Sequence, residues 1–161
     1  MHRILITIFA AATLAACGTA STLVDSAYTG GMRFDDASIS AGTHTVPVDG
    51  GAVQEFESRL RERIIDSGMF TEQSGGLTIE YRFLAFNSGN RMARYFWGGI
   101  GNAGEASTTI EVVFRDASGE VLSRIQSEGR IDSGFFGGSA NNAVTRAADE
   151  VAEYTITTFN Q

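Results

Sequence analysis

The chain has 161 residues, of which 19 are acidic and 12 are arginine, with no lysine, and its formal net charge is −7 at pH 7. This negative balance argues against a nucleic acid partner, because affinity for nucleic acid comes mostly from neutralising phosphates. Cys17 is the single cysteine, which excludes an internal disulfide, so burial of apolar side chains must hold the fold together. The length suits one domain.

Residues 1–16 are predicted to form a lipoprotein signal peptide. A basic start is followed by the apolar run 4–14, which is too short for the roughly 20 residues of a membrane-spanning helix. The sequence Leu14-Ala15-Ala16-Cys17 resembles the lipobox of bacterial lipoproteins. The resemblance implies cleavage before Cys17 and lipidation of that residue, palmitate included, which would leave a mature chain of net charge −8.

The same resemblance implies a location in the cell envelope, anchored to the membrane through the lipid on Cys17. Gly18 stands where an aspartate would retain a lipoprotein in the inner membrane. We therefore expect the protein at the outer membrane, facing the periplasm. Residues 17–33 are small, polar and rich in glycine, and they are predicted to form a flexible tether, with a short strand around Thr22 to Asp25 as the open alternative. Residues 34–161 are predicted to form a single domain.

Two helices are predicted from apolar residues spaced three and four apart. The first spans residues 52–67 and ends at Gly68, where a left-handed C-cap is favoured. Its inner stripe consists of Val53, Phe56, Leu60 and Ile64, whereas Arg59 is placed on the outer face. The last helix begins near Asn141, and its inner stripe consists of Val144, Ala148, Val151, Thr155 and Phe159.

Strands are predicted at 34–40, 77–85, 107–115 and 120–131, with a tight turn at 116–119. On the strand 120–131, the residues expected on the buried face are Val121, Ile125 and Ile131. The order β-α-β-β-β-α indicates an α+β fold with a small, largely antiparallel sheet and two helices on one face. Strand directions place the connections 87–105 and 132–140 at one end of this sheet, and the tether is expected to enter at the opposite end.

The middle of the chain carries a recognisable set of residues: Gly89-Asn90-Arg91-Met92-Ala93-Arg94-Tyr95, the glycines at 98, 99, 101 and 104, Val112-Val113-Phe114-Arg115-Asp116, Gly119 and Val121-Leu122. They resemble domain of unknown function 4410, a group of Gram-negative envelope lipoproteins and secreted relatives. The later Gly134, Gly137 and Gly138 are similar to the end of that family's pattern. The resemblance implies a location and a fold, but no reaction.

Catalytic and metal-binding patterns are weak, and the protein is not expected to be an enzyme. Residues 99–104 fit G-x-G-x-x-G, but a strand follows where a dinucleotide site needs a helix, so no cofactor is expected. His44 is the only histidine after the leader, and a lone loop histidine is more often exposed than catalytic. No cysteine pair, H-E-x-x-H or calcium-loop pattern is present, so no metal is expected.

The best candidates for an interaction surface are aromatic residues next to arginines, a composition typical of interface hot spots and membrane-interface belts. They are Arg91, Arg94, Tyr95, Phe96, Trp97, Phe135 and Phe136. Three roles are open for them: packing onto the end of the core, contact with another protein or a second copy, and contact with a bilayer.

These patterns together predict a lipid-anchored envelope protein that acts as a structural or protein-interaction module. Its expected partners are the membrane, through Cys17, and either another envelope protein or a second copy of the chain. The alternative is a carrier that holds a small hydrophobic ligand between helices and sheet. A cavity lined by Phe56, Tyr81 and Phe114 would favour that alternative.

Overall fold

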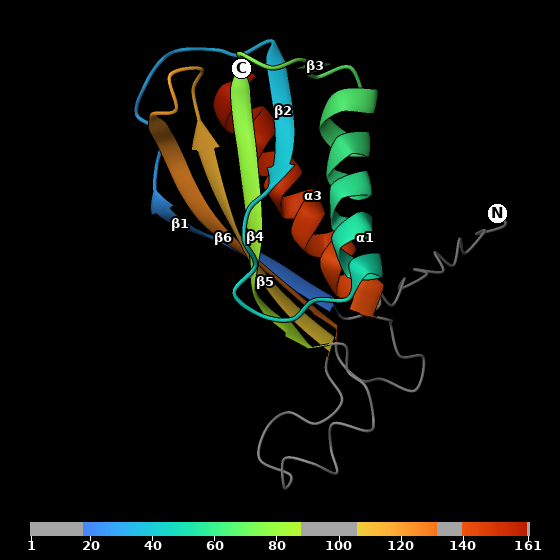
Figure 1. Cartoon of the computed structure of the whole chain (residues 1–161). Helices are drawn as coiled ribbons and strands as arrows, with labels where there is room; N and C mark the ends of the chain where they lie inside the picture. The colour runs from blue at the N-terminus through green and yellow to red at the C-terminus, as the bar shows by residue number, and fades with distance from the viewer. Residues whose placement is uncertain (1–17, 88–105, 132–139, 161) are drawn as a thin grey trace, which may run out of the picture.

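The computed structural model describes residues 18–87, 106–131 and 140–160. One sheet and two long helices form two layers, with both helices on the same face of the sheet (Figure 1). The strands are β1 (Gly18–Ser26), β2 (Asp36–Ala41), β3 (Thr71–Glu72), β4 (Leu77–Asn87), β5 (Ala106–Arg115) and β6 (Val121–Ile131). The helices are α1 (Gly50–Arg61), continued by the π-helical turn η1 (Glu62–Asp66), and α3 (Ala140–Phe159).

The sheet is mixed rather than largely antiparallel, and the predicted order β-α-β-β-β-α is wrong. Its six strands lie in the order β1-β6-β5-β4-β2-β3. Pairs β1–β6, β6–β5 and β5–β4 are antiparallel, whereas β4–β2 and β2–β3 are parallel. The sequence pattern missed β3, which is only two residues long. It also missed most of β1, for which it offered only a short strand at 22–25, because β1 is mostly exposed and has no buried apolar face.

Strand β1 takes up part of the segment that was expected to be a tether. Its backbone pairs with β6 from Gly18, opposite Ile131, to Ser26, opposite Arg124. Backbone hydrogen bonds to the neighbouring strand thus order a segment whose side chains carry no clear alternation. From the end of the sheet where β1 finishes, the chain crosses to the far side of the strand order, where Phe34 N–H donates to Phe159 O at 2.9 Å, and enters β2 beside β4.

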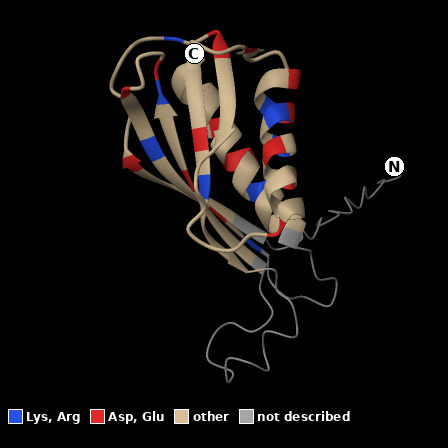
Figure 2. Cartoon of the chain, viewed as in Figure 1, with Lys and Arg blue, Asp and Glu red and all other residues tan. Residues whose placement is uncertain are grey.

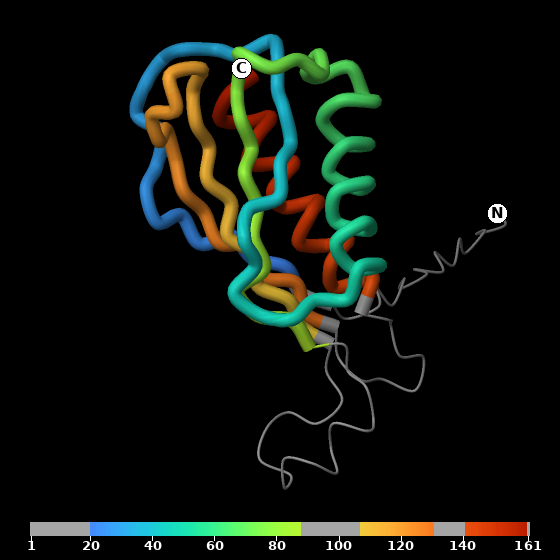
Figure 3. Tube along the Cα trace, in the orientation of Figure 1, coloured from blue at the N-terminus to red at the C-terminus, as the bar shows by residue number. Residues whose placement is uncertain are grey.

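Strands β1, β4, β5 and β6 each have one terminus at the same end of the sheet (Figure 3). At this end β1 and β5 begin, and β4 and β6 finish. Asn87 pairs with Ser107, Ala106 pairs with Ile131, and Ile131 pairs with Gly18. The connections 88–105 and 132–139 therefore both leave from this end, as the strand directions predicted. Strand β2 begins at the opposite end and runs parallel to β4, so the tether meets the domain there, as predicted. Gly18, the first described residue of the tether, nevertheless lies at the same end as the two connections, because it pairs with Ile131.

The core lies between the helices and the inner face of the sheet. Phe56, Leu60 and Ile64 are fully buried, as the predicted stripe required, while Val53 is half-buried. The predicted stripe of α3 is fully buried throughout. The buried side of β6 consists of Ser123, Ile125, Ser127 and Gly129. Val121 was predicted to be on this side but is exposed, because the pairing of β5 with β6 shifts by one residue between Phe114 and Arg115.

Small residues on β6 allow α3 to approach the sheet closely. A Cβ atom built on Gly129 would lie 1.9 Å from the carbonyl oxygen of Ala143. Ser127 Oγ donates to Ala147 O at 3.0 Å, so the helix backbone lies within hydrogen-bond reach of the strand's side chains. The glycine is therefore required by the spacing between two backbones.

Charged residues lie along both helices (Figure 2), and an ion pair between Arg59 and Asp149 links the two helices. Arg59 donates to Asp149 through Nε (2.9 Å) and Nη2 (3.2 Å), and also contacts Glu62. These hydrogen bonds, the one to Asp149 foremost, raise the pKa of Arg59 above its usual value. Arg59 thus bridges α1 and α3 rather than standing alone on an outer face.

The turn between β5 and β6 is organised by the Asp116 carboxylate. Its Oδ1 atom accepts from Ser118 Oγ (2.7 Å), Ser118 N (2.8 Å) and Glu120 N (3.0 Å), while Gly119 supplies the positive φ of 85°. The hydrogen bond from the Ser118 side chain, with those from the backbone, lowers the pKa of Asp116 below its usual 3.8.

We expect Asp116→Ala to have a lower free energy of unfolding than the wild type at pH 7. The difference between the two proteins should become smaller at acidic pH. A carboxyl group whose pKa is lower in the folded state contributes stability above its unfolded pKa and loses it as the pH falls through its folded pKa. The gap should therefore shrink below about pH 4. Urea unfolding of both proteins from pH 7 to pH 2.5 measures it, and an unchanged gap would show that the ionised carboxylate is not what stabilises the turn.

Candidate site on the open face of the sheet

The face of the sheet away from the helices has a polar hollow on strands β4, β5 and β6. No described helix covers this face (Figure 1). The hollow has a volume of about 270 Å³ and is lined by Thr43, Glu80, Arg82, Glu111, Val113, Arg115 and Arg124. The lining residues of each strand are spaced two apart, so strand alternation places them on the same face.

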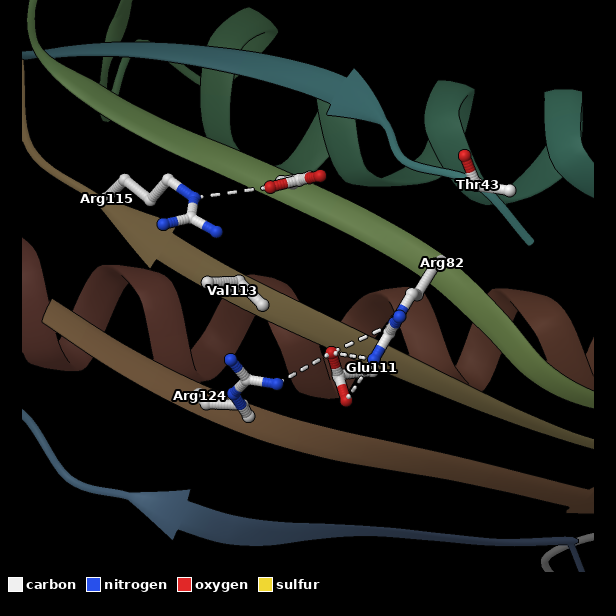
Figure 4. A pocket seen from close by; sticks show the side chains of 7 residues that line it. Thr43, Arg82, Glu111, Val113, Arg115 and Arg124 are labelled. Carbon is white, nitrogen blue, oxygen red and sulfur yellow. Dashed lines mark hydrogen bonds and ion pairs between the residues drawn. The ribbon is translucent and has the colours of Figure 1, made fainter. Parts of the chain in front are cut away.

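A buried carboxylate, Glu111, holds two of the arginines. Only 7% of its side chain is exposed, although it lies on the uncovered face. Arg82 donates to it through Nε (3.0 Å) and Nη2 (3.1 Å), and Arg124 donates through Nη1 (3.2 Å). Figure 4 shows both guanidinium groups turned towards this carboxylate. Two cations thus compensate one buried anion.

The third arginine, Arg115, lies on the other side of Val113 (Figure 4). Its Nε donates to Glu80 Oε2 at 3.3 Å and its Nη1 to Gly119 O at 3.2 Å. Between the arginines, the Val113 side chain is almost fully buried and forms an apolar floor. With three arginines and two glutamates, the hollow carries a local charge of +1 in a chain whose net charge is −7.

The hydrogen bond to Glu111, followed by the attraction of its charge, raises the pKa of Arg82 above its usual value. The three guanidinium groups of the hollow form an array of hydrogen-bond donors without acceptors, and such an array can recognise an anion.

His44 has a structural role rather than a place in this hollow. Its Nδ1 atom accepts from Phe83 N–H at 3.4 Å, and its ring lies against Tyr81 and Phe83 with centroids 6.2 and 5.3 Å apart. The adjacent Thr45 N–H donates to Phe83 O at 3.0 Å. His44 therefore helps to attach the segment after β2 to β4, where no second catalytic group accompanies it in the described contacts.

Every residue named from the sequence as an interaction candidate lies outside the described residues. This applies to Arg91, Arg94, Tyr95, Phe96, Trp97, Phe135 and Phe136, and to the lipidation candidate Cys17. Within the described ranges, no three histidine, cysteine, aspartate or glutamate side chains gather where they could hold a metal ion. None of the described helices is long and apolar enough to cross a membrane.

The residues that would line a carrier's cavity instead fill the interior. Phe56 and Tyr81 pack with ring centroids 4.8 Å apart, and Phe114 packs against Phe159 at 4.9 Å. All of them are fully buried. The Tyr81 hydroxyl donates to Glu57 at 3.1 Å, and burial, reinforced by that carboxylate, raises the pKa of Tyr81 well above its usual range. No observation here favours a hydrophobic ligand.

The two layers and the polar open face define an α+β domain in which the described helices cover one side of a mixed sheet. The chain belongs to the family described as Domain of unknown function (DUF4410), whose model matches residues 44–133, more than half of the sequence. This confirms the family suggested by the residues of the middle section. No curated protein matches the chain.

Two solved structures share this fold at low sequence identity. Both are PelC dodecamers from Paraburkholderia phytofirmans, and one of them carries a single substitution. Each is 14% identical to this chain and covers 90% of it, with all of the PelC chain aligned, and the TM-scores are 0.53 for the variant and 0.54 for the other. At that identity the likeness concerns the fold.

Sequence reasoning missed the arginine hollow. The signal was present as Arg82, Glu111 and Arg124 at outward positions of three predicted strands, where polar residues are expected on a solvated face. Only the pairing of Arg82 with Glu111 and of Arg124 with Val113 brings these side chains together. A one-residue shift in either register would have separated them.

Proposed function

We propose that this protein is a lipid-anchored envelope protein, located at the outer membrane and facing the periplasm, that acts as a structural or protein-interaction module and associates with copies of itself. The observation that carries the proposal is the position of Gly18. This residue directly follows Cys17 and is already paired with Ile131 in the sheet. A lipid on Cys17 would therefore hold one end of the sheet next to the membrane surface.

This attachment gives the domain a defined orientation. With β1 starting one residue after the anchor, the segment from Gly18 to Ser26 acts as part of the sheet and not as a spacer. The connections 88–105 and 132–139 carry the aromatic and arginine candidates, and both leave from strand ends that lie at this same end of the sheet. Membrane contact and contact with a neighbouring copy are the roles that this end of the domain favours.

Self-association is supported by the fold's relatives and by an unpaired edge. The PelC structures of the same fold are dodecamers. In the described sheet, β1 is an edge strand bonded only to β6, and it exposes Leu23 (63%) and Val24 (42%). A long edge strand with exposed apolar side chains is a template for pairing with another chain unless charge or a covering element protects it.

Expression of the full-length protein in a Gram-negative host tests both parts of the proposal. Wild type should incorporate radiolabelled palmitate and fractionate with the outer membrane, whereas Cys17→Ser should stay unlabelled and retain residues 1–16. Thr19→Ala, which leaves the lipobox intact, is the matched control and should behave as wild type.

Self-association is tested in mild detergent, where light scattering should give wild type a mass several times that of one protomer. Leu23→Lys should lower this mass, because it places a charge on the exposed edge strand β1.

The two parts fail separately. Palmitate entering Cys17→Ser at the wild-type level would disprove the lipid anchor. If wild type has the mass of a single protomer at every concentration, self-association is disproved. If Leu23→Lys has the same oligomeric mass as wild type, the exposed edge of β1 is excluded as the contact between copies.

A further inference from the structure

We propose that the hollow on the open face, between Arg82, Arg115 and Arg124, is a binding site for a small oxyanion: the carboxylate of an acidic sugar or a phosphate group. The proposal does not depend on the lipid anchor or on self-association.

The first argument is an excess of donors. The three arginines make five hydrogen bonds to oxygen atoms of the described residues. A guanidinium group has more N–H donors than these contacts occupy, and it has no acceptor. Two oxygen atoms of a carboxylate or of a phosphate group can accept two parallel N–H bonds from the planar guanidinium group, which makes arginine the preferred side chain for recognising both.

The second argument is the free-energy cost of burying the Glu111 carboxylate. A carboxylate with 7% of its side chain exposed must be compensated by good partners, because taking a charge out of water is unfavourable. Here that carboxylate fixes two guanidinium groups, Arg82 through a bidentate contact and Arg124 through Nη1. Glu111 is thus a positioning residue: it orients the donors before a ligand arrives, which reduces the ordering cost of binding.

The third argument is the shape and charge of the hollow. Its volume of about 270 Å³ is enough for one small polar molecule, and the exposed Thr43 borders it. Its floor, Val113, is apolar and buried, which offers a surface to the carbon face of a sugar ring. The local charge of +1 attracts anions although the chain as a whole repels them.

Equilibrium dialysis of the full-length protein in detergent, at low ionic strength, tests the proposal. The probes are radiolabelled inorganic phosphate and glucuronate, with glucose as the neutral control. We expect saturable binding of at least one anion and none of glucose. Binding of glucuronate alone identifies an acidic sugar as the ligand class, and binding of phosphate alone identifies a phosphate group.

The double variant Arg115→Gln, Arg124→Gln should weaken binding at least about tenfold, since each lost charge-assisted hydrogen bond is worth about that factor. It keeps the bidentate Arg82–Glu111 contact. The matched control, Arg63→Gln with Arg146→Gln, removes the same charge from the helical layer and should bind as wild type does. Thr43→Glu, which adds a carboxylate at the exposed rim without breaking an ion pair, should weaken binding to a similar degree.

No saturable binding of either anion to the wild type would overturn the proposal. An equal loss in both double variants would also overturn it, because it would indicate general attraction of counterions. If the double variant Arg115→Gln, Arg124→Gln does not fold, the affinity of Thr43→Glu tests the proposal instead. Wild-type affinity in Thr43→Glu would show that the anion does not bind in the hollow and would overturn the proposal.

Discussion

Gly129→Ala is expected to lower the free energy of unfolding by about 1–3 kcal/mol, and Gly129→Val by more, as overpacking in a close-packed interior does. The added Cβ atom would lie 1.9 Å from the Ala143 carbonyl oxygen and 2.9 Å from its carbon. Both are backbone atoms of α3, so no side-chain rotation relieves the contact. The helix must move away from β6, which opens the packing around Ala147 and Val144 as well.

Urea unfolding followed by circular dichroism measures this loss, and Gly50→Ala is the matched control. No atom lies within 4 Å of a Cβ built on Gly50, the first residue of α1. Alanine there should leave stability unchanged or raise it by up to about 1 kcal/mol, through lower entropy of the unfolded chain. Wild-type stability in Gly129→Ala would mean that α3 lies farther from β6 than described.

Leu60→Ala is expected to lower the free energy of unfolding by about 2–5 kcal/mol, the range for a large side chain removed from a closed core. Leu60 is fully buried between the helical layer and the sheet. A single domain has a total stability of only about 5–15 kcal/mol, so this one change removes a large share of it. Thermal and urea unfolding both report the loss.

Ser58→Ala, on the exposed side of the same helix, should change stability by less than about 0.5 kcal/mol. Arg59 is a poor control, because its partly exposed contact with Asp149 joins two helices and is worth up to about 1 kcal/mol. Equal losses for Leu60→Ala and Ser58→Ala would show that the phase of α1 is wrong.

The long elements were predictable because their side chains repeat with the period of the structure. Leu77, Ile79, Tyr81 and Phe83 alternate and are all fully buried, and the stripe of α3 is spaced three and four apart. Gly68 and Gly119 both have positive φ, at the helix end and the turn where the sequence placed them. Local patterns of this kind carry enough information to define an element and its buried side.

Elements held by their backbone were not predictable. Strand β1 has no buried apolar face, so its position comes from hydrogen bonds to β6 along an edge. The same limit applies to Val121, whose phase depends on the register shift between β5 and β6. It also applies to Arg59, whose partner Asp149 belongs to another helix, 90 residues later in the chain.

The sequence alone determined where apolar surface must be buried, and with it the two helices, the central strands and the family. The lipidation of Cys17 stays a prediction from the sequence. Only the tertiary structure decided what these elements bring together: Gly18 beside Ile131, and Arg82, Glu111 and Arg124 around one hollow. The physical reason is that burial follows from the local period of the chain, whereas strand register, edge pairing and ion pairs depend on contacts between residues far apart in sequence.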